Sequence, residues 1–548
     1  MLRLRHCVCS LVLLMGFVIF SGNIFAEAQK ENKRPNIFFL FVDDWGRYAS
    51  IYPENPVNTV IHTPAFDRLA HEGVRFLNAH VNAPSCTPSR SALFSGKYFY
   101  QTGQGSILYP SFWDLAIPSF PLLLEESGYR IGFTYKAWSP GRNPDAPIGG
   151  DRTRFDGAGE RFNQFGLNVT QMVAAGQDLE AAKEEVYAEV LKNFEMFLAA
   201  AKNCPEESAK PFLYFLGPRN THRYSRWPIG SGKALWGLDP DNLKGKMPKF
   251  VPDVPEIRED FNDYLGQVLA LDALLDRFLK KLEEIGELDN TIIVASGDHG
   301  IGGFPRGKCN LYDTGTGVAL LVRWGDKVKG GRTIYDFVNL MDLAPTFLEV
   351  GGLTPPDVMV ARSILPLLLS DKEGQIDPTR DYIVAGRERH VSVARTDLSP
   401  YPSRAIRTHD FLYIRNFEPE RWPIGMPFHR ERNDSPQEMW DNTLATTRYT
   451  FGDMDMSPTK AWFVLHDADP QWQRYRDFAF AIRPGEELYD LRNDPDCLVN
   501  VADNPAYESV RKGLSERLMK ILISTEDPRV TGDGMMFERP PFGGRNPN

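Results

Sequence analysis

Pairs of acidic or imidazole side chains follow two apolar segments of the chain. Asp43 and Asp44 come directly after one segment, and Asp298 and His299 come shortly after the other. Each pair alone is typical of a turn or a helix cap. Three carboxylates in one site would repel one another unless a divalent cation joined them, and Ca²⁺ accepts about six to eight oxygen ligands. The pairs predict a Ca²⁺ site, in which His299 is the unusual ligand because imidazole suits softer metals.

Three basic residues occupy similar positions. Lys136 ends another apolar segment, His222 follows a further one in the loop GPRNTHR, and Lys308 lies ten residues after Asp298. Taken singly, each is more typical of a solvated or packed side chain. Cations beside a metal ion suit a tetrahedral oxyanion such as phosphate or sulfate. This pattern indicates hydrolysis of an ester at phosphorus or sulfur.

Cys86 lies in a Pro/Ser-rich segment, residues 82–98. It lacks the nearby second cysteine or histidine that a zinc site requires. A cysteine nucleophile would need a nearby base and no hard metal, and thiolate is a poor ligand for Ca²⁺. A disulfide with one of the other three cysteines of the mature chain, Cys204, Cys309 or Cys497, stays open. Residue type and spacing alone leave the role of this thiol undecided.

The elements that would position these residues alternate between strand-like and helical patterns. The segments are 37–42, 63–71, 130–136, 212–216, 260–285, 291–296 and 318–324. Such alternation predicts an α/β fold with a mostly parallel sheet. Ligands of such sheets bind at the carboxyl ends of the strands, where the residues above are found.

Beyond about residue 370 the chain becomes rich in proline, arginine and aromatic residues, and long apolar helices are not expected until 508–524. This predicts a catalytic domain over 33–375 and a smaller α+β domain over 380–530. The chain has 548 residues, of which 42% are hydrophobic and 24% charged, with a net charge of −10. These are values of a globular protein, and the acidic balance excludes a nucleic-acid partner.

The N-terminus has the features of a secretory signal peptide. Arg3 and Arg5 precede an apolar run over 11–20, and small residues follow at Ala26 and Ala28. The run is nearer to ten residues than to the about 20 that a membrane anchor needs. The sequence therefore predicts that residues 1–28, with Cys7 and Cys9, are removed. No stable membrane span is expected, and the protein would be secreted or periplasmic, or lysosomal in a eukaryote.

The segment CTPSR, residues 86–90, resembles the signature of the type I sulfatases, and FSGK, residues 94–97, loosely resembles the element that follows it. Other matches follow in the family's order over about residues 35–505. They are Asp43-Asp44, Asp298-His299-Gly300, Lys308, ELYDL at 487–491 and Asp494-Pro495. GFPRGKCNLYDTGTGVALLV, residues 303–322, and PLLL, residues 121–124, look most like the N-sulfoglucosamine sulfohydrolase (heparan N-sulfatase) branch.

The resemblance implies an alkaline-phosphatase-like α/β/α sandwich with a large mixed, mostly parallel sheet, and a smaller C-terminal domain with an antiparallel sheet. It also implies that a formylglycine-generating or anaerobic sulfatase-maturing enzyme converts Cys86 to Cα-formylglycine, at the N-terminus of a helix over 89–98. One hydroxyl of the hydrated aldehyde would attack sulfur, and the second would then expel sulfate by breaking the C–O bond. A homodimer stays open.

The residue roles also come from the resemblance. Arg90 would hold the formylglycine hydroxyls, Lys136 and Lys308 would neutralise sulfate oxygens, and His222 would protonate the leaving group. The predicted Ca²⁺ ligands are Asp43, Asp44, Asp298, His299 and an oxygen of the modified Cys86. The substrate would be a sulfated carbohydrate carrying an O-sulfate or an N-sulfate.

The chain departs from the family after Lys136. Members commonly have a histidine two residues further, where this chain has Trp138. Trp138 could pack on a sugar face or belong to the core. A second open question concerns residues that could bind anionic groups of a glycan or form surface ion pairs, namely Glu388, Arg389, His390, Arg404 and Arg407. Two rival functions also stay open, a phosphodiester or phosphonate hydrolase of the same fold and a non-catalytic glycan-binding protein.

Overall fold

The computed structural model describes residues 34–142, 145–202 and 204–543. The expected signal peptide 1–28, with Cys7 and Cys9, lies outside these residues. No helix within the described ranges has the length and apolar character that crossing a membrane requires. The cysteines of the described residues, Cys86, Cys204, Cys309 and Cys497, form no disulfide with one another.

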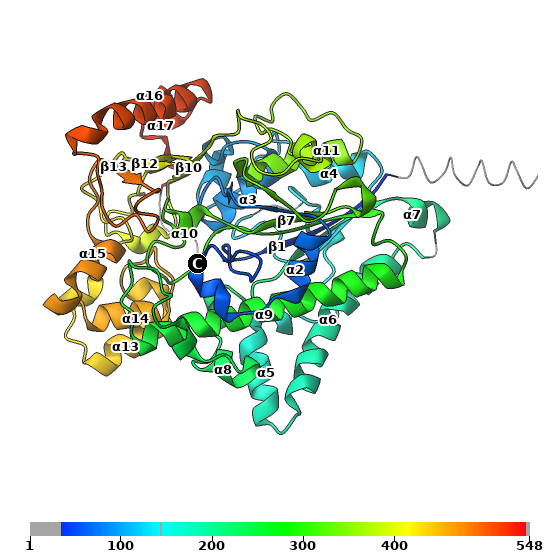
Figure 1. Cartoon of the computed structure of the whole chain (residues 1–548), viewed down its shortest axis with the longest axis horizontal. Helices are drawn as coiled ribbons and strands as arrows, with labels where there is room; N and C mark the ends of the chain where they lie inside the picture. Colours follow the sequence, from blue (N-terminus) through cyan, green and yellow to red (C-terminus); the bar gives the residue numbers. More distant parts are fainter. Residues whose placement is uncertain (1–33, 143–144, 203, 544–548) are drawn as a thin grey trace, which may run out of the picture.

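A seven-stranded sheet forms the centre of the molecule (Figure 1). Its strand order is β4-β5-β1-β6-β7-β2-β8, and β7 runs antiparallel to both of its neighbours. The strands are β1 (Asn36–Val42), β2 (Val74–Phe76), β4 (Arg130–Tyr135), β5 (Phe212–Gly217), β6 (Thr291–Gly297), β7 (Leu320–Arg323) and β8 (Arg332–Ile334). This confirms the predicted α/β fold with a mixed, mostly parallel sheet.

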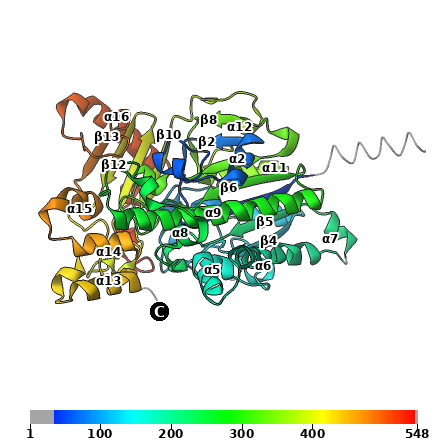
Figure 2. The ribbon, with the colours of Figure 1, turned by 60° about the horizontal axis from the view of Figure 1, so that its bottom comes forward.

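Apolar side chains project from both faces of the sheet, because successive residues of a strand point in opposite directions. In β1, Phe38 and Leu40 pack with the helices of one face, and Ile37 and Phe39 pack with those of the other. The first layer contains α2 (Pro64–His71), α6 (Leu179–Ala199) and α9 (Pro255–Glu284). The second contains α3 (Cys86–Ser95), α4 (Phe120–Glu126) and α11 (Leu343–Val350), on the other side of the sheet from α6 and α9 in Figure 1. In Figure 2, α9 crosses in front of the sheet.

Strand register brings the chemically active residues to one edge. Val42 of β1 lies opposite Gly297 of β6, so that Asp43 and Asp298 follow side by side. Tyr135 of β4 lies opposite Gly217 of β5, which places Lys136 and the loop after β5 at the same edge. The polar residues that follow four parallel strands therefore meet at their carboxyl ends.

A second sheet of four antiparallel strands follows, as predicted. It consists of β10 (Tyr382–Arg387), β11 (Ser403–Thr408), β12 (Phe411–Asn416) and β13 (Glu486–Asp490). Helix α16 (Glu508–Ser524) packs on it through Leu518 and Leu522. Residues 99–107, from the first predicted domain, share an apolar cluster with this sheet. The two segments therefore pack together, and the ranges 33–375 and 380–530 for separate domains remain a prediction.

Three helices between β12 and β13 were not expected from the sequence. They are α13 (Pro436–Ala445), α14 (Pro458–Leu465) and α15 (Gln473–Phe480). Trp462 and Phe463 of α14 join the apolar cluster that includes α9. Helix α14, which belongs to the predicted domain 380–530, therefore packs into the core of the predicted domain 33–375.

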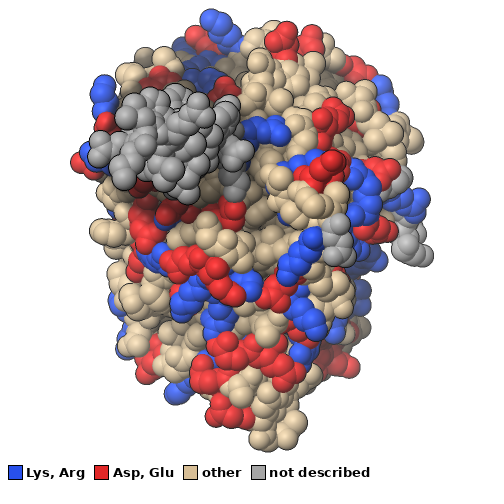
Figure 3. All heavy atoms as spheres, turned by 90° about the vertical axis from the view of Figure 1, so that its right-hand side faces the viewer, with Lys and Arg blue, Asp and Glu red and all other residues tan. Residues whose placement is uncertain are grey.

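The face at the amino ends of the parallel strands lies opposite the edge described above. On this face Lys and Arg side chains are interspersed with Asp and Glu (Figure 3). Several of them form ion pairs, such as Arg323 with Glu72 and with Asp289. This face therefore carries charge of both signs in close mixture.

Candidate active site

Helix α3 places Cys86 at the carboxyl edge of the sheet. The helix begins at Cys86, three residues earlier than the predicted start, and ends at Ser95 because Gly96 adopts a left-handed conformation with φ of 63°. Cys86 is only 2% exposed. Its side chain therefore stands at the start of a helix, where backbone N–H groups without an intrahelical partner favour anions.

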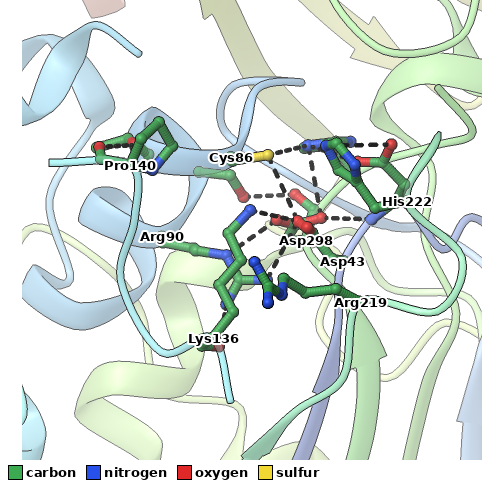
Figure 4. Close-up of polar contacts among 12 residues, drawn as sticks. Asp43, Cys86, Arg90, Lys136, Pro140, Arg219, His222 and Asp298 are labelled. Carbon is green, nitrogen blue, oxygen red and sulfur yellow. Dashed lines mark hydrogen bonds and ion pairs between the residues drawn. The ribbon is translucent and has the colours of Figure 1, made fainter. Parts of the chain in front are cut away.

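The predicted metal ligands gather around this thiol (Figure 4). Sγ of Cys86 lies 3.4 Å from Oδ1 of Asp43 and 3.3 Å from Nε2 of His299. Ligand atoms of Asp43, Cys86, Asp298 and His299 lie within 4.8 Å of one another, and Asp44 belongs to an overlapping group with Asp43 and Cys86. Oδ2 of Asp43 is buried and has no hydrogen-bond partner among the described residues. A cation between these residues would satisfy that oxygen.

His299 has the orientation of a ligand. Its Nδ1 lies 3.0 Å from the carbonyl oxygen of Gly300, so that Nδ1–H donates and the lone pair of Nε2 is free. Nε2 faces the carboxylates of Asp44 and Asp298, at 3.5 Å from each. This imidazole can complete a site whose other ligands are oxygens.

The backbone of the first acidic pair is held in an unusual conformation. Asp44 has φ of 58°, which non-glycine residues rarely adopt. The hydroxyl of Tyr264 donates to the carbonyl oxygen of Asp44 at 2.9 Å, and that of Thr221 donates to the carbonyl oxygen of Asp43 at 2.5 Å. The surrounding structure thus fixes the direction of both carboxylates.

Arg90 and Lys136 form the first pair of cations. Nε of Arg90 donates to Oδ2 of Asp298 at 2.9 Å, and Nζ of Lys136 donates to Oδ1 of Asp43 at 2.6 Å. Burial is the largest single influence and acts to lower the pKa of Lys136, but Asp43 and the other negative groups around it together outweigh burial and raise that pKa. Lys136 is therefore a charged group at the floor of the site.

Lys308 is the third cation and connects His222 to the acidic cluster. Its Nζ lies 3.0 Å from Oδ1 of Asp44, 3.0 Å from Oδ2 of Asp455 and 3.1 Å from Nε2 of His222. The backbone N–H of Tyr224 donates to Nδ1 of His222, which leaves Nε2 facing Lys308. Asp455 escaped the sequence analysis because it follows no strand, and an Asp-x-Asp pair before Ser-Pro is typical of a turn.

The cluster holds more negative than positive charge. Four buried carboxylates (Asp43, Asp44, Asp298 and Asp455) surround three buried cations (Arg90, Lys136 and Lys308). Burial raises the pKa of Asp44 well above its usual range, although Lys308 opposes this. Burial and then Asp43 raise the pKa of the Cys86 thiol to about 11, so that the thiol is protonated. The charge excess and the orphaned carboxylate oxygen fit a divalent cation.

A cavity of about 970 Å³ opens above this cluster. Of the predicted site residues, it is lined by Asp43, Cys86, Lys136, His222, Lys308 and His390. Four further charged residues line its wall that were not predicted from the sequence, namely Glu160, Arg219, Arg448 and Asp455. The residues behind the wall, among them Arg90 and Asp298, support those that face the cavity.

Trp138 does not line this cavity. Its indole is buried, packs edge to face on Trp113 and donates to Oγ of Ser91 at 2.9 Å. Of the two alternatives, the structure favours the core, and contact with a sugar remains a prediction. A tryptophan in this position fills the core beneath the loop because its N–H has a partner inside the protein.

Most of the predicted glycan-binding residues of the second segment are also buried in pairs. Arg404 bonds to Glu388 at 2.8 Å and to Asp527 at 2.5 Å, and Glu388 also accepts from Arg529. Arg389 donates to the carbonyl oxygen of Phe542. Arg407 is only partly buried and pairs with Asp313. His390 is the one member of this set that lines the cavity, and it contacts Ser85. Apart from His390, these residues hold the second sheet to its surroundings and do not line the cavity.

We expect Arg404→Ala to lower the free energy of unfolding by about 3 to 5 kcal/mol, because it leaves buried carboxylates without their partner. Urea unfolding measures this loss. The control is Arg474→Ala, which removes an exposed arginine outside the cavity and is expected to change stability by less than about 0.5 kcal/mol. Unchanged stability with a raised KM would restore Arg404 to the substrate site.

Family models match most of the chain. The model described as sulfatase matches residues 35–353, and the one described as N-sulphoglucosamine sulphohydrolase, C-terminal, matches residues 298–424. The first alone covers more than half of the chain, and it contains Cys86 and all predicted metal ligands.

Curated proteins and solved structures agree with this assignment. An ulvan-active sulfatase of Formosa agariphila is 26% identical over 92% of this chain and 77% of its own length. Human N-sulphoglucosamine sulphohydrolase is 26% identical over 97% of this chain and 96% of its own length. The phosphonate monoester hydrolase of Agrobacterium radiobacter shares the fold, with a TM-score of 0.58 and 18% identity over 90% of this chain and 96% of its own. The chain therefore belongs to the sulfatase family and is a sulfuric ester hydrolase with an alkaline-phosphatase-like fold.

Proposed function

We propose that this protein releases sulfate from sulfated carbohydrates, with Cys86 converted to Cα-formylglycine and Ca²⁺ held between the strand ends. The observation that carries the proposal is the buried contact of Cys86 with Asp43 and His299, beside two charged lysines. A thiol with a pKa near 11 is a poor nucleophile at neutral pH, which argues against direct attack by Cys86. A maturing enzyme would have to modify this residue before the site works.

The predicted ligands would hold the cation through Asp43, Asp44, Asp298 and His299. When bound, it would polarise a sulfate oxygen and favour an ionised nucleophile. The hydrated aldehyde would supply a hydroxyl as the nucleophile and a second hydroxyl that allows sulfate to leave without another attack at sulfur. Arg90 supports this assignment, because its buried Nη2 lies 3.5 Å from Oδ1 of Asp43 but makes no hydrogen bond among the described residues, and it would donate to a hydroxyl of residue 86.

The remaining roles belong to side chains that line the cavity. Lys136 and Lys308 keep their charge through Asp43 and Asp44 and would neutralise two sulfate oxygens. Burial and then the neighbouring Lys308 lower the pKa of His222 to about 3, so that the ring, once protonated, would readily give the proton on Nε2 to the leaving oxygen or nitrogen. The hydrogen bond from the Tyr224 N–H to Nδ1 fixes the ring in this orientation.

The charge of the site favours a monoanionic substrate. A divalent cation would favour the ionised form of Asp44, whose pKa burial raises; four ionised carboxylates, three cationic side chains and that ion then sum to one positive charge. A sulfate monoester carries a single negative charge and would neutralise the site. A phosphate monoester dianion would leave an uncompensated buried charge, which is costly.

Carbohydrate substrates are supported by the relatives and by the cavity. Two of the similar proteins are named for sulfated polysaccharide or sulfated glucosamine. A volume of about 970 Å³ lies at the upper end of the usual range of ligand pockets, about 300–1,000 Å³, and admits more than one sugar ring. The expected signal peptide would deliver the enzyme to such substrates outside the cytoplasm, in secreted or periplasmic form.

A phosphonate monoester is also a monoanion, and the phosphonate monoester hydrolase of Agrobacterium radiobacter shares the fold of this chain. We expect kcat/KM for an aryl sulfate to exceed that for the matching aryl phosphonate by about 100-fold or more, because the lysines are placed for sulfate. Release of the same nitrophenolate from both esters measures the ratio. A faster phosphonate reaction would replace the proposed function by the alternative.

A further inference from the structure

We propose that Arg448 and Arg219 form a second anion site at the mouth of the cavity, which binds a carboxylate or sulfate on a sugar next to the one that loses sulfate. The inference rests on the proposed function and gives its substrate class, a glycan with a second acidic group. Both arginines line the same cavity as Cys86 and Lys136.

Arg448 is available to a ligand. It is exposed, it lies in the short helix η12 (Thr447–Tyr449), and none of the described carboxylates lies within ion-pair distance of its guanidinium. An arginine without a partner on the wall of an enzyme cavity keeps all its donors for a bound molecule. Its planar group suits the two oxygens of a carboxylate or sulfate.

The segment that carries Arg448 is anchored from below. Nζ of Lys460 is completely buried and donates to the carbonyl oxygens of Thr447 at 3.1 Å and Met454 at 2.7 Å. The N–H of Met456 donates to Oγ1 of Thr447. The backbone of the subsite is therefore fixed before a ligand arrives, which lowers the entropy lost on binding.

Arg219 lies in the loop after β5 and is an exposed residue of the same cavity wall; Figure 4 shows it on the loop that leads to His222. Its backbone N–H donates to Asn163 at 3.0 Å, and its carbonyl oxygen accepts from the N–H of His222 at 3.0 Å. The guanidinium is 3.6 Å from Glu160, and both side chains are about half exposed. Such a pair contributes little stability, so a substrate anion can replace Glu160 as the partner.

These two arginines are not needed for the sulfate that is removed. Lys136 and Lys308 already face that group beside Cys86, whereas Arg219 and Arg448 add positive charge further out. Arg448 also lies beyond residue 424, where the matches to both family models end. The part of the wall that it forms lies between α13 and α14, and we infer that it sets the preference of the enzyme among sulfated glycans.

Binding without turnover tests the subsite. The probes are sulfated tetrasaccharides derived from heparin and from ulvan, their carboxyl-reduced forms, and forms that keep only the sulfate at the non-reducing end. Calorimetry with Cys86→Ala protein is expected to give a Kd about tenfold lower for a parent tetrasaccharide than for the form that lacks the recognised anion. Loss of affinity on carboxyl reduction identifies a uronate, and loss on removal of internal sulfates identifies a second sulfate.

Arg448→Ala in the same background is expected to abolish this tenfold preference, and Arg219→Ala to reduce it. The matched control, Arg474→Ala, should keep it, because that exposed arginine does not line the cavity. Equal affinity for all forms, persistence of the preference after Arg448→Ala, or no binding of any probe would overturn the inference. Failure of the proposed function would give a different result: the unsubstituted, modified enzyme would release no sulfate even from an aryl sulfate.

Discussion

Cys86→Ala is expected to lower kcat for sulfate ester hydrolysis by at least about 10⁴-fold while the protein remains folded. Alanine cannot be converted to an aldehyde, so that neither the attacking hydroxyl nor the group that releases sulfate would exist. The side chain lost is small, and helix α3 keeps its other buried residues. Sulfate release and thermal unfolding, measured on the same preparation, separate chemistry from stability.

Cys204→Ala is the matched control for this substitution. Cys204 is exposed and distant in sequence from the site residues, so its removal should leave kcat and the melting temperature unchanged. Hydrolysis by the Cys86→Ala protein at the rate of the parent would contradict the role assigned to residue 86.

Removal of divalent cations is expected to lower kcat by about 100-fold or more, and Ca²⁺ is expected to restore it. The physical reason is the excess of buried carboxylates, which repel one another and leave Oδ2 of Asp43 without a partner until a cation is bound. Chelation followed by addition of Ca²⁺ measures both steps. A ligand that binds the folded protein also raises its melting temperature, which gives a readout independent of turnover.

Asp43→Asn is expected to weaken this Ca²⁺-dependent rise of the melting temperature, because an amide oxygen is a weaker ligand than a carboxylate. Asp326→Asn is the control, since Asp326 is exposed and does not line the active-site cavity. Full activity after chelation, together with an unchanged Ca²⁺ effect in the Asp43→Asn protein, would refute a metal site at this position.

Much of the site was predictable because it follows from strand order and periodicity. A charged residue that follows an apolar strand lies at the carboxyl edge of a parallel sheet. Val42 pairs with Gly297, so that Asp43 and Asp298, the residues that follow them, lie side by side at this edge. Lys136 follows the same rule after β4. The local pattern was thus sufficient wherever the ligand edge is built from strand ends.

The remainder depends on contacts between distant segments. Asp455 reaches Lys308 only because α14 packs against α9, and no local pattern reports such packing. Arg404 has the sequence of an anion-binding residue, yet Asp527, more than a hundred residues later, completes its buried pair. Trp138 occupies a position where the resemblance to the sulfatases predicts a histidine, but its indole turns inward and donates to Ser91. Tertiary partners, which sequence alone cannot supply, decided each of these three cases.

Mass spectrometry of the peptide that contains residue 86, from enzyme produced in a host with a sulfatase-maturing enzyme, tests the central claim most directly. We expect a peptide lighter than the cysteine form by the difference between a thiol and an aldehyde side chain, in a fraction that rises in proportion to specific activity. Active enzyme in which the whole of Cys86 remains an unmodified thiol would contradict the account.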